Sequence, residues 1–309
     1  MQEGQQLEPR GRGPVAEGAW RKTEKQGDEV AWTVFEDAEI RGRFEESSGI
    51  LWAEMQHRER CCFTPALLAS GEAFLRWLVR AVAKDGLAVR WLVWCSAARI
   101  FGTGGDLGHF LACIEGGERE ALVAYARRCI ELVHASWRAY DLPLRTVALV
   151  EGEALGGAFE AALACDLLIA ERGAKFGFPE ALFGLFPGMG ATSLLARRVP
   201  ARVVRELVQD SLTRSAEELA DLGLVHGLVE PGHGRAGCRQ LLIAGARHFA
   251  RDLALDRVRR RIEALSLAEL SDIVELWVAR AFALEPAMRR RMAHFARCQA
   301  KKRAAGHRG

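Results

Sequence analysis

The pattern of hydrophobic and polar positions changes character twice along the chain. Residues 1 to 28 lack apolar periodicity and are rich in Gln, Glu, Gly, Arg and Pro, so we predict a disordered tail there. From 29 to 235, short apolar runs typical of strands alternate with segments of helical periodicity. From 236 to 309 the pattern is helical throughout. We therefore predict a tail, a core domain at 29–235 and a C-terminal helical region at 236–309.

The alternation in the core domain predicts an α/β fold with a helical appendage. Pro65 opens the first helical segment, where proline is favoured because its missing N–H has no partner to lose. The predicted helices of the core are 65–83, 118–138, 158–165, 189–198, 201–210 and 215–222. The predicted strands are 32–35, 50–53, 89–94, 146–150, 167–170, 175–178 and 225–229.

Composition narrows the classes of function. The 309 residues carry a formal net charge of +3, which does not favour a nucleic-acid partner. The eight cysteines are scattered without a CxxC pair, so we expect no metal site and reduced thiols in a cytoplasmic protein. The most apolar stretch, 148–170, contains four carboxylates, which excludes a membrane span. The glycine-rich segment 101–107 lacks dinucleotide spacing, and no cofactor is expected.

Positive charge gathers at the end of the chain. Residues 285 to 309 contain eight Lys or Arg against the single acidic residue Glu285. A basic helix of this kind indicates either an acidic partner or an ordinary solvated face, and the pattern alone does not choose between them.

Two glutamates occur where carboxylates are unusual. Glu160 and Glu180 are both surrounded by small or apolar residues, so burial is expected to raise the pKa of each carboxyl. Two such groups facing one cavity would serve as a general acid and a general base. The structural alternative is a pair of buried glutamates that cap backbone amides or meet an arginine such as Arg172 or Arg197.

Two glycine-rich turns supply a second candidate feature. An enolate or tetrahedral oxyanion, as formed in acyl chemistry, is stabilised by two backbone N–H groups, preferably with one at a helix N-terminus. Gly157 opens the helix that carries Glu160, and Gly104-Gly105 follows a predicted strand. Glycine lets the backbone approach a ligand closely, although each turn alone is weak support because glycine turns are common.

Three motifs in order carry a family resemblance. The chain resembles the enoyl-CoA hydratase/isomerase (crotonase) superfamily over about residues 30 to 305, through 154–166 (ALGGAFEAALACD), 176–180 (FGFPE) and 186–190 (FPGMG). Within it, the chain is most similar to the diffusible signal factor synthases, which make cis-2-unsaturated fatty acid signals. That similarity rests on 60–63 (RCCF), 101–110 (FGTGGDLGHF), 125–129 (YARRC), 159–163 (FEAAL), 179–189 (PEALFGLFPGM) and 275–278 (ELWV).

The resemblance implies a spiral of ββα units with a C-terminal helical trimerisation region. It implies an oxyanion hole made of the N–H groups of Gly105 and Gly157, and it makes Glu160 and Glu180 the catalytic pair. The implied reaction dehydrates a 3-hydroxyacyl thioester to a cis-2-enoyl thioester and then hydrolyses it to the free acid. We assign Glu180 to the α-proton.

The resemblance also implies a substrate channel and partners. Met189, Trp277 and Phe295 fall at positions that line the acyl chain, although Trp277 also lies on an ordinary helical core face. The segment 105–108 departs from the usual hydratase sequence, which favours an acyl carrier protein thioester over a CoA thioester. Expected partners are acyl carrier protein, a sensor-kinase receiver domain as regulator, and further copies in a homotrimer or dimer of trimers.

Two alternatives share these residues. One is an ordinary enoyl-CoA hydratase or isomerase that acts on CoA thioesters and releases no free acid. The other is a protein of this fold that acts mainly by binding a regulator. Intact glutamates and both glycine turns argue against a purely non-catalytic role.

Overall fold

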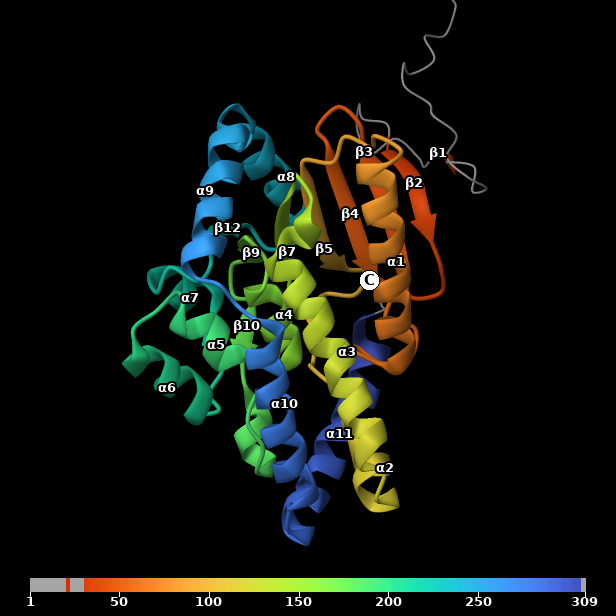
Figure 1. Cartoon of the computed structure of the whole chain (residues 1–309), viewed down its shortest axis with the longest axis vertical. Helices are drawn as coiled ribbons and strands as arrows, with labels where there is room; N and C mark the ends of the chain where they lie inside the picture. The colour runs from red at the N-terminus through yellow and green to blue at the C-terminus, as the bar shows by residue number, and fades with distance from the viewer. Residues whose placement is uncertain (1–20, 23–30, 307–309) are drawn as a thin grey trace, which may run out of the picture.

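The computed structural model describes residues 21–22 and 31–306 (Figure 1). Its larger sheet has eight strands, in the spatial order β1 (Arg21–Lys22), β2 (Ala31–Glu36), β3 (Ile40–Glu45), β4 (Ile50–Met55), β5 (Trp91–Ser96), β7 (Arg145–Val150), β9 (Leu167–Glu171) and β12 (Gly227–Val229). The first four pair antiparallel, and the strands from β4 to β12 pair parallel. The central parallel strands are covered on both faces, which explains their nearly continuous apolar sequences.

A smaller sheet lies beside the first and has the order β11 (Arg214–Ser215), β10 (Lys175–Gly177), β8 (Glu153–Leu155) and β6 (Ile100–Gly102). Three times in succession, a strand of the large sheet is followed directly by one of the small sheet and then by a helix. These units are β5–β6–α2, β7–β8–α4 and β9–β10–η2, with α2 at Leu107–Gly116, α4 at Gly157–Leu163 and the 3-10 helix η2 at Pro179–Phe183. The predicted α/β spiral of ββα units is confirmed.

The other helices cover the sheets and build the C-terminal region. They are α1 (Pro65–Ala83), α3 (Arg119–Trp137), η1 (Ala139–Asp141), α5 (Ala191–Ala196), α6 (Ala201–Gln209), α7 (Ala216–Asp221), α8 (Gly234–Gly245), η3 (Ala246–His248), α9 (Phe249–Ile262), α10 (Leu267–Phe282) and α11 (Pro286–Gly306). Pro65 is the first residue of α1, as predicted, and the Thr64 side chain caps that helix by accepting from the Leu67 amide. Within the described residues, no helix combines the length and apolar character needed to cross a membrane.

The C-terminal helices are part of the body of the molecule. α8 packs on β7, β9 and β12, α10 packs along α3, and α11 contacts both α2 and η2. Figure 1 shows α2, α3, α10 and α11 gathered at one end of the molecule. The helix α8 begins at Gly234, and helices that follow it form walls of the site described below. The predicted tail lies outside the described residues except for Arg21–Lys22, which pair with β2.

Several elements were missing from the predicted pattern, among them β3, α2, β6 and β8. β3 alternates apolar residues with arginine and contains Gly42, so its strand character depends on pairing with β2 and β4 on either side. α2 follows directly on a glycine-rich loop and is short, and its start is fixed by the Asp106 side chain, which accepts from two amides of the first turn. β6 and β8 have three residues each and form only because the small sheet assembles around them.

Candidate active site

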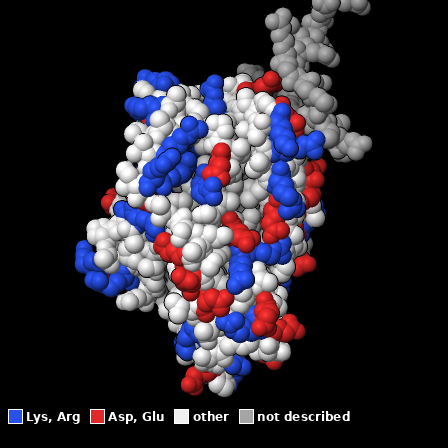
Figure 2. Space-filling view, in the orientation of Figure 1, with Lys and Arg blue, Asp and Glu red and all other residues white. Residues whose placement is uncertain are grey.

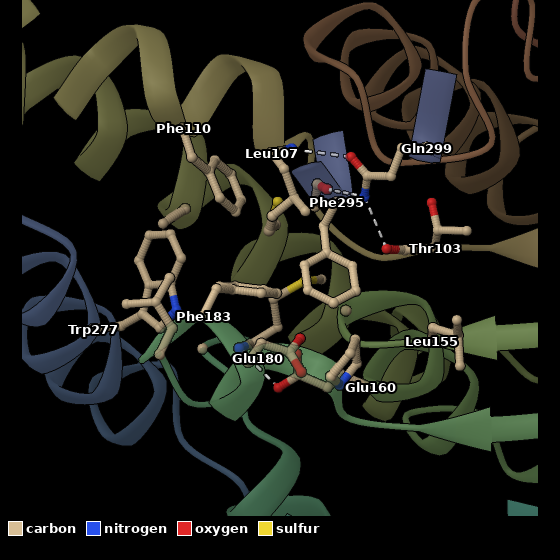
Figure 3. Close-up of a pocket in the computed structure, with 18 of the residues that line it drawn as sticks. Thr103, Leu107, Phe110, Leu155, Glu160, Glu180, Phe183, Trp277, Phe295 and Gln299 are labelled. Atoms are coloured by element: carbon tan, nitrogen blue, oxygen red, sulfur yellow. Dashed lines mark hydrogen bonds between the residues drawn. The ribbon is translucent and has the colours of Figure 1, made fainter. Parts of the chain in front are cut away.

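A largely apolar pocket of about 220 Å³ lies where the small sheet, α3 and the C-terminal helices meet (Figure 3). Its wall is drawn from segments far apart in the chain, including Thr103, Gly105, Leu107, Phe110, Leu155, Gly157, Glu160, Glu180, Phe183, Met189, Trp277, Phe295 and Gln299. Two carboxylates in a lining of this kind are the feature that requires a chemical explanation.

Glu160 lies in the first turn of α4 and is 1% exposed. Its Oε1 accepts hydrogen bonds from the amides of Met189 at 2.8 Å and Ala191 at 2.7 Å. Burial raises the pKa of the Glu160 carboxyl to about 7, and the two amide hydrogen bonds oppose this rise. The alternative of a glutamate that caps backbone amides therefore applies to Oε1 of Glu160 alone.

Glu180 lies in the first turn of η2, and its Oε2 is buried with no hydrogen-bond partner among the described residues. Burial raises the pKa of this carboxyl to about 8, and the charge of Glu160 raises it further in the same direction. Figure 3 shows the two glutamates next to each other, across the pocket from Phe110. A carboxyl group with an open lone pair and a high pKa is suited to proton transfer with a bound ligand.

Neither arginine considered in the structural alternative reaches these glutamates. Arg172 pairs with Glu217 and Glu230 on the surface. Arg197 forms its ion pair with Glu269 at 2.8 Å. The buried carboxylates are therefore not held as ordinary ion pairs with these side chains.

The amides of Gly105 and Gly157 approach each other beside the glutamates. A Cβ built on Gly157 would lie 3.6 Å from the Gly105 nitrogen and would overlap the Met189 thioether. A Cβ built on Gly105 would overlap the Phe110 ring. Within the described part of the chain, neither amide donates to a protein acceptor. Both glycines are thus required by close approach, and their N–H groups remain available to a ligand oxygen.

The loop that carries Gly105 is held from the far end of the chain. Gln299 of α11 is 5% exposed, and its amide nitrogen donates to the carbonyl oxygens of Thr103 at 3.0 Å and Gly105 at 2.9 Å. Its Oε1 accepts from the Leu107 amide at 3.2 Å (Figure 3). Gln299 was not among the predicted site residues, because a single glutamine in a basic helical segment carries no signal for this role.

A second group of contacts fixes the end of the same loop. The Tyr125 hydroxyl donates to the Phe63 carbonyl and accepts from the Asp106 amide. One oxygen of Asp106 caps α2, and its other oxygen accepts from Arg60 at 2.8 Å. Both carboxylate oxygens of Asp106 therefore accept hydrogen bonds from the protein, and we do not expect this residue to bind a ligand.

The three predicted chain-lining residues all border the pocket. The Trp277 indole packs edge-on against Phe110 with ring centroids 5.0 Å apart, and Phe295 contacts Phe183 at 5.6 Å. Trp277 is also 6% exposed, so it is a core residue and a pocket residue at once. The two roles considered for Trp277, lining the acyl chain and packing in the core, therefore do not exclude each other.

Comparison with known proteins agrees with this architecture. The enoyl-CoA hydratase/isomerase family model matches residues 80–233, a range that contains both glutamates and both glycine turns. A probable enoyl-CoA hydratase of Bacillus subtilis is 35% identical over 137 residues, covering 44% of this chain and 51% of the relative. Over this range the chain is similar to the enoyl-CoA hydratase/isomerase (crotonase) superfamily.

Two further relatives show how much of this chain and of each related protein is matched. The crotonyl-CoA hydratase of Syntrophomonas wolfei is 34% identical over 155 residues, which are 50% of this chain and 56% of that protein. An enoyl-CoA hydratase/isomerase structure from Xanthobacter autotrophicus Py2 superposes with a TM-score of 0.68 at 25% identity, covering 87% of this chain and 99% of the other. The first curated relatives are matched over only 24 to 51% of their lengths.

Proposed function

We propose that this protein is a crotonase-superfamily enzyme that interconverts 2-enoyl and 3-hydroxyacyl thioesters. The observation that carries the proposal is the pair of neighbouring carboxyls, Glu160 and Glu180, with pKa values raised to about 7 and about 8 beside two unpartnered amides. The relatives named as hydratases support the CoA-linked reaction better than the signal-synthase prediction.

The geometry supports a different proton-transfer role for each glutamate. In dehydration, Glu180 takes the α-proton of the 3-hydroxyacyl group, because its Oε2 has no competing hydrogen bond among the described residues. The thioester oxygen becomes an enolate oxygen and accepts from the amides of Gly105 and Gly157. Glu160, oriented by two amides through Oε1, protonates the departing hydroxyl, which leaves as water. Hydration follows the same steps in reverse and starts from ionised Glu160 and protonated Glu180, the singly protonated form that pKa values of about 7 and about 8 favour. Dehydration starts from the less populated form with Glu180 ionised.

A diffusible signal factor synthase is a second candidate, favoured by the sequence stretches 101–110 and 179–189. In that reaction a carboxylate activates water, which attacks the same polarised thioester carbonyl and releases a cis-2-enoic acid and the carrier thiol. The additional step needs no group beyond those already described. Its partners are an acyl carrier protein and a sensor-kinase receiver domain.

Only part of the basic C-terminal segment is available to bind an acidic carrier protein. Arg289 donates to the Leu284 carbonyl and Arg291 donates to the Leu182 carbonyl, each at 2.9 Å, so both stabilise the surroundings of α11. Arg290 is exposed and available for an acidic partner. On the face drawn in Figure 2, basic and acidic side chains are interspersed.

One assay separates the two candidates. The purified protein is incubated with C4 to C12 3-hydroxyacyl thioesters of CoA and of acyl carrier protein, and the products are identified by mass spectrometry. We expect conversion to the enoyl thioester, and no conversion by a Glu160→Gln/Glu180→Gln double variant. Release of a cis-2-enoic acid selects the signal synthase, whereas no product from any thioester contradicts both.

We also propose that the protein assembles as a trimer through α9. Leu255, Val258 and Ile262 recur at helical spacing on this helix and are 58%, 53% and 79% exposed. Exposed apolar side chains in such a row favour a protein interface. Light scattering should give three times the chain mass, and replacing Val258 and Ile262 with Lys should give the monomer mass; an unchanged mass in the variant would exclude this helix from the interface.

A further inference from the structure

A second apolar cavity, of about 90 Å³, lies directly behind the first pocket. Met189 and Cys129 line both spaces, so these two side chains form the partition between them. The far wall is built by α1 and α3, including Gly71 and Leu132. The proposed reaction does not use this cavity.

The absence of a side chain at Gly71 keeps the second cavity open, although the neighbouring side chains leave room for one. It lies in the interior of α1, where glycine is less favourable for helix formation than alanine. A Cβ built there would meet only the Leu132 methyl carbons, at 3.5 and 3.9 Å, which are ordinary contact distances. Packing therefore does not require glycine at this position, and the missing side chain keeps the cavity open.

The end of the cavity is shaped by unusual backbone. Ala139, Tyr140 and Asp141 have φ values of 48°, 57° and 56°, three successive non-glycine residues in the left-handed region. Such conformations are unfavourable and persist where surrounding structure imposes them, often at ligand sites. They bring the Tyr140 hydroxyl to Trp94, whose indole nitrogen donates to it at 3.0 Å. This wall sets a fixed end to the cavity.

We propose that the second cavity binds the distal end of a linear acyl chain and selects medium-chain thioesters. The inference rests on the proposed function, because the thioester end must lie at Glu160 and Glu180 for the chain to point this way. Met189 acts as the movable partition, since a methionine side chain is flexible and adapts to an apolar ligand. By comparison with an apolar cavity of about 150 Å³ that holds benzene, the space accommodates about three to four carbons.

The test fills the cavity from the side remote from the glutamates. Gly71→Leu places a branched side chain in the space, whereas the matched variant Gly71→Ala adds one methyl group at ordinary contact distance. kcat/KM is measured for C4 and C10 thioesters. We expect the C10 to C4 ratio to fall by at least about tenfold in Gly71→Leu and by less than about twofold in Gly71→Ala.

The outcomes separate this inference from the proposed function. An unchanged ratio of the C10 to the C4 kcat/KM in a folded Gly71→Leu variant overturns the inference. The acyl chain would then have to lie along Trp277. If the leucine variant does not fold, Leu132→Trp fills the same cavity from a half-buried position on α3. If the wild type converts no thioester, the proposed reaction fails, and the cavity is tested by calorimetric binding of decanoate against butanoate. Loss of decanoate affinity in the filled variant then supports the cavity, and equal affinity overturns it.

Discussion

Replacing Glu180 with Gln is expected to lower kcat by about 10² to 10⁴-fold, because the amide keeps the shape of the side chain but cannot exchange a proton. The carboxyl makes no hydrogen bond through Oε2 in the described structure, so the substitution breaks no observed contact of that oxygen. KM is expected to change much less, since the apolar lining that holds the acyl chain is intact. Initial rates with a 2-enoyl thioester over a range of concentrations give both quantities.

The pH dependence follows from the raised pKa values. The productive state has one carboxylate and one carboxylic acid, and the pair titrates with pKa values of about 7 and about 8. Below about pH 7 both groups are protonated and the base is lost; above about pH 8 both are ionised and the acid is lost. The profile of kcat/KM is therefore expected to be bell-shaped with its maximum between these values. The Glu180→Gln variant should lose this bell.

The matched control is Glu151→Gln. Burial also raises the pKa of Glu151, yet this residue does not line the pocket. Its rate is expected to stay within about threefold of the wild type. A Glu180→Gln variant that folds normally, judged by circular dichroism and urea unfolding, but retains wild-type kcat would remove Glu180 from the reaction.

Local sequence was sufficient to predict the parts of the site that depend on neighbours in the chain. Glu160 and Glu180 stand among apolar residues, and both pKa values are raised by burial as predicted. Gly157 begins α4 as predicted, because a glycine turn leads into a short apolar helix. The fold class followed from strand and helix alternation, which is a property of successive short segments.

Contacts between distant segments were not accessible in the same way. The Gln299 side chain reaches Leu107, 192 residues earlier, and the second cavity depends on how α1 packs against α3. Gly71 looks in sequence like any glycine in an apolar helix. Its meaning depends on the empty space beside it, which only the packed structure defines.

Gly157→Ala is expected to lower kcat by about 10² to 10³-fold, as much as the loss of one oxyanion-hole donor, because the added methyl group keeps the enolate oxygen away from amides that are themselves retained. The new methyl group would lie 3.6 Å from the Gly105 nitrogen and 3.7 Å from the Gly104 Cα, in the space assigned to the enolate oxygen. Its only overlap is with the thioether of Met189, a flexible side chain that can move aside. Alanine is also the better helix former, so stability should change little.

Two further variants make this experiment specific. Gly245→Ala is the matched control, because a Cβ there meets nothing within 4 Å and the residue ends α8 far along the chain. Met189→Ala combined with Gly157→Ala removes the overlapping thioether and leaves the new methyl group between the two amides. A rate loss that persists in the double variant, relative to Met189→Ala alone, locates the effect at the amides. Recovery of the rate would show instead that displacement of Met189 caused the loss, and the oxyanion would then have to be held elsewhere.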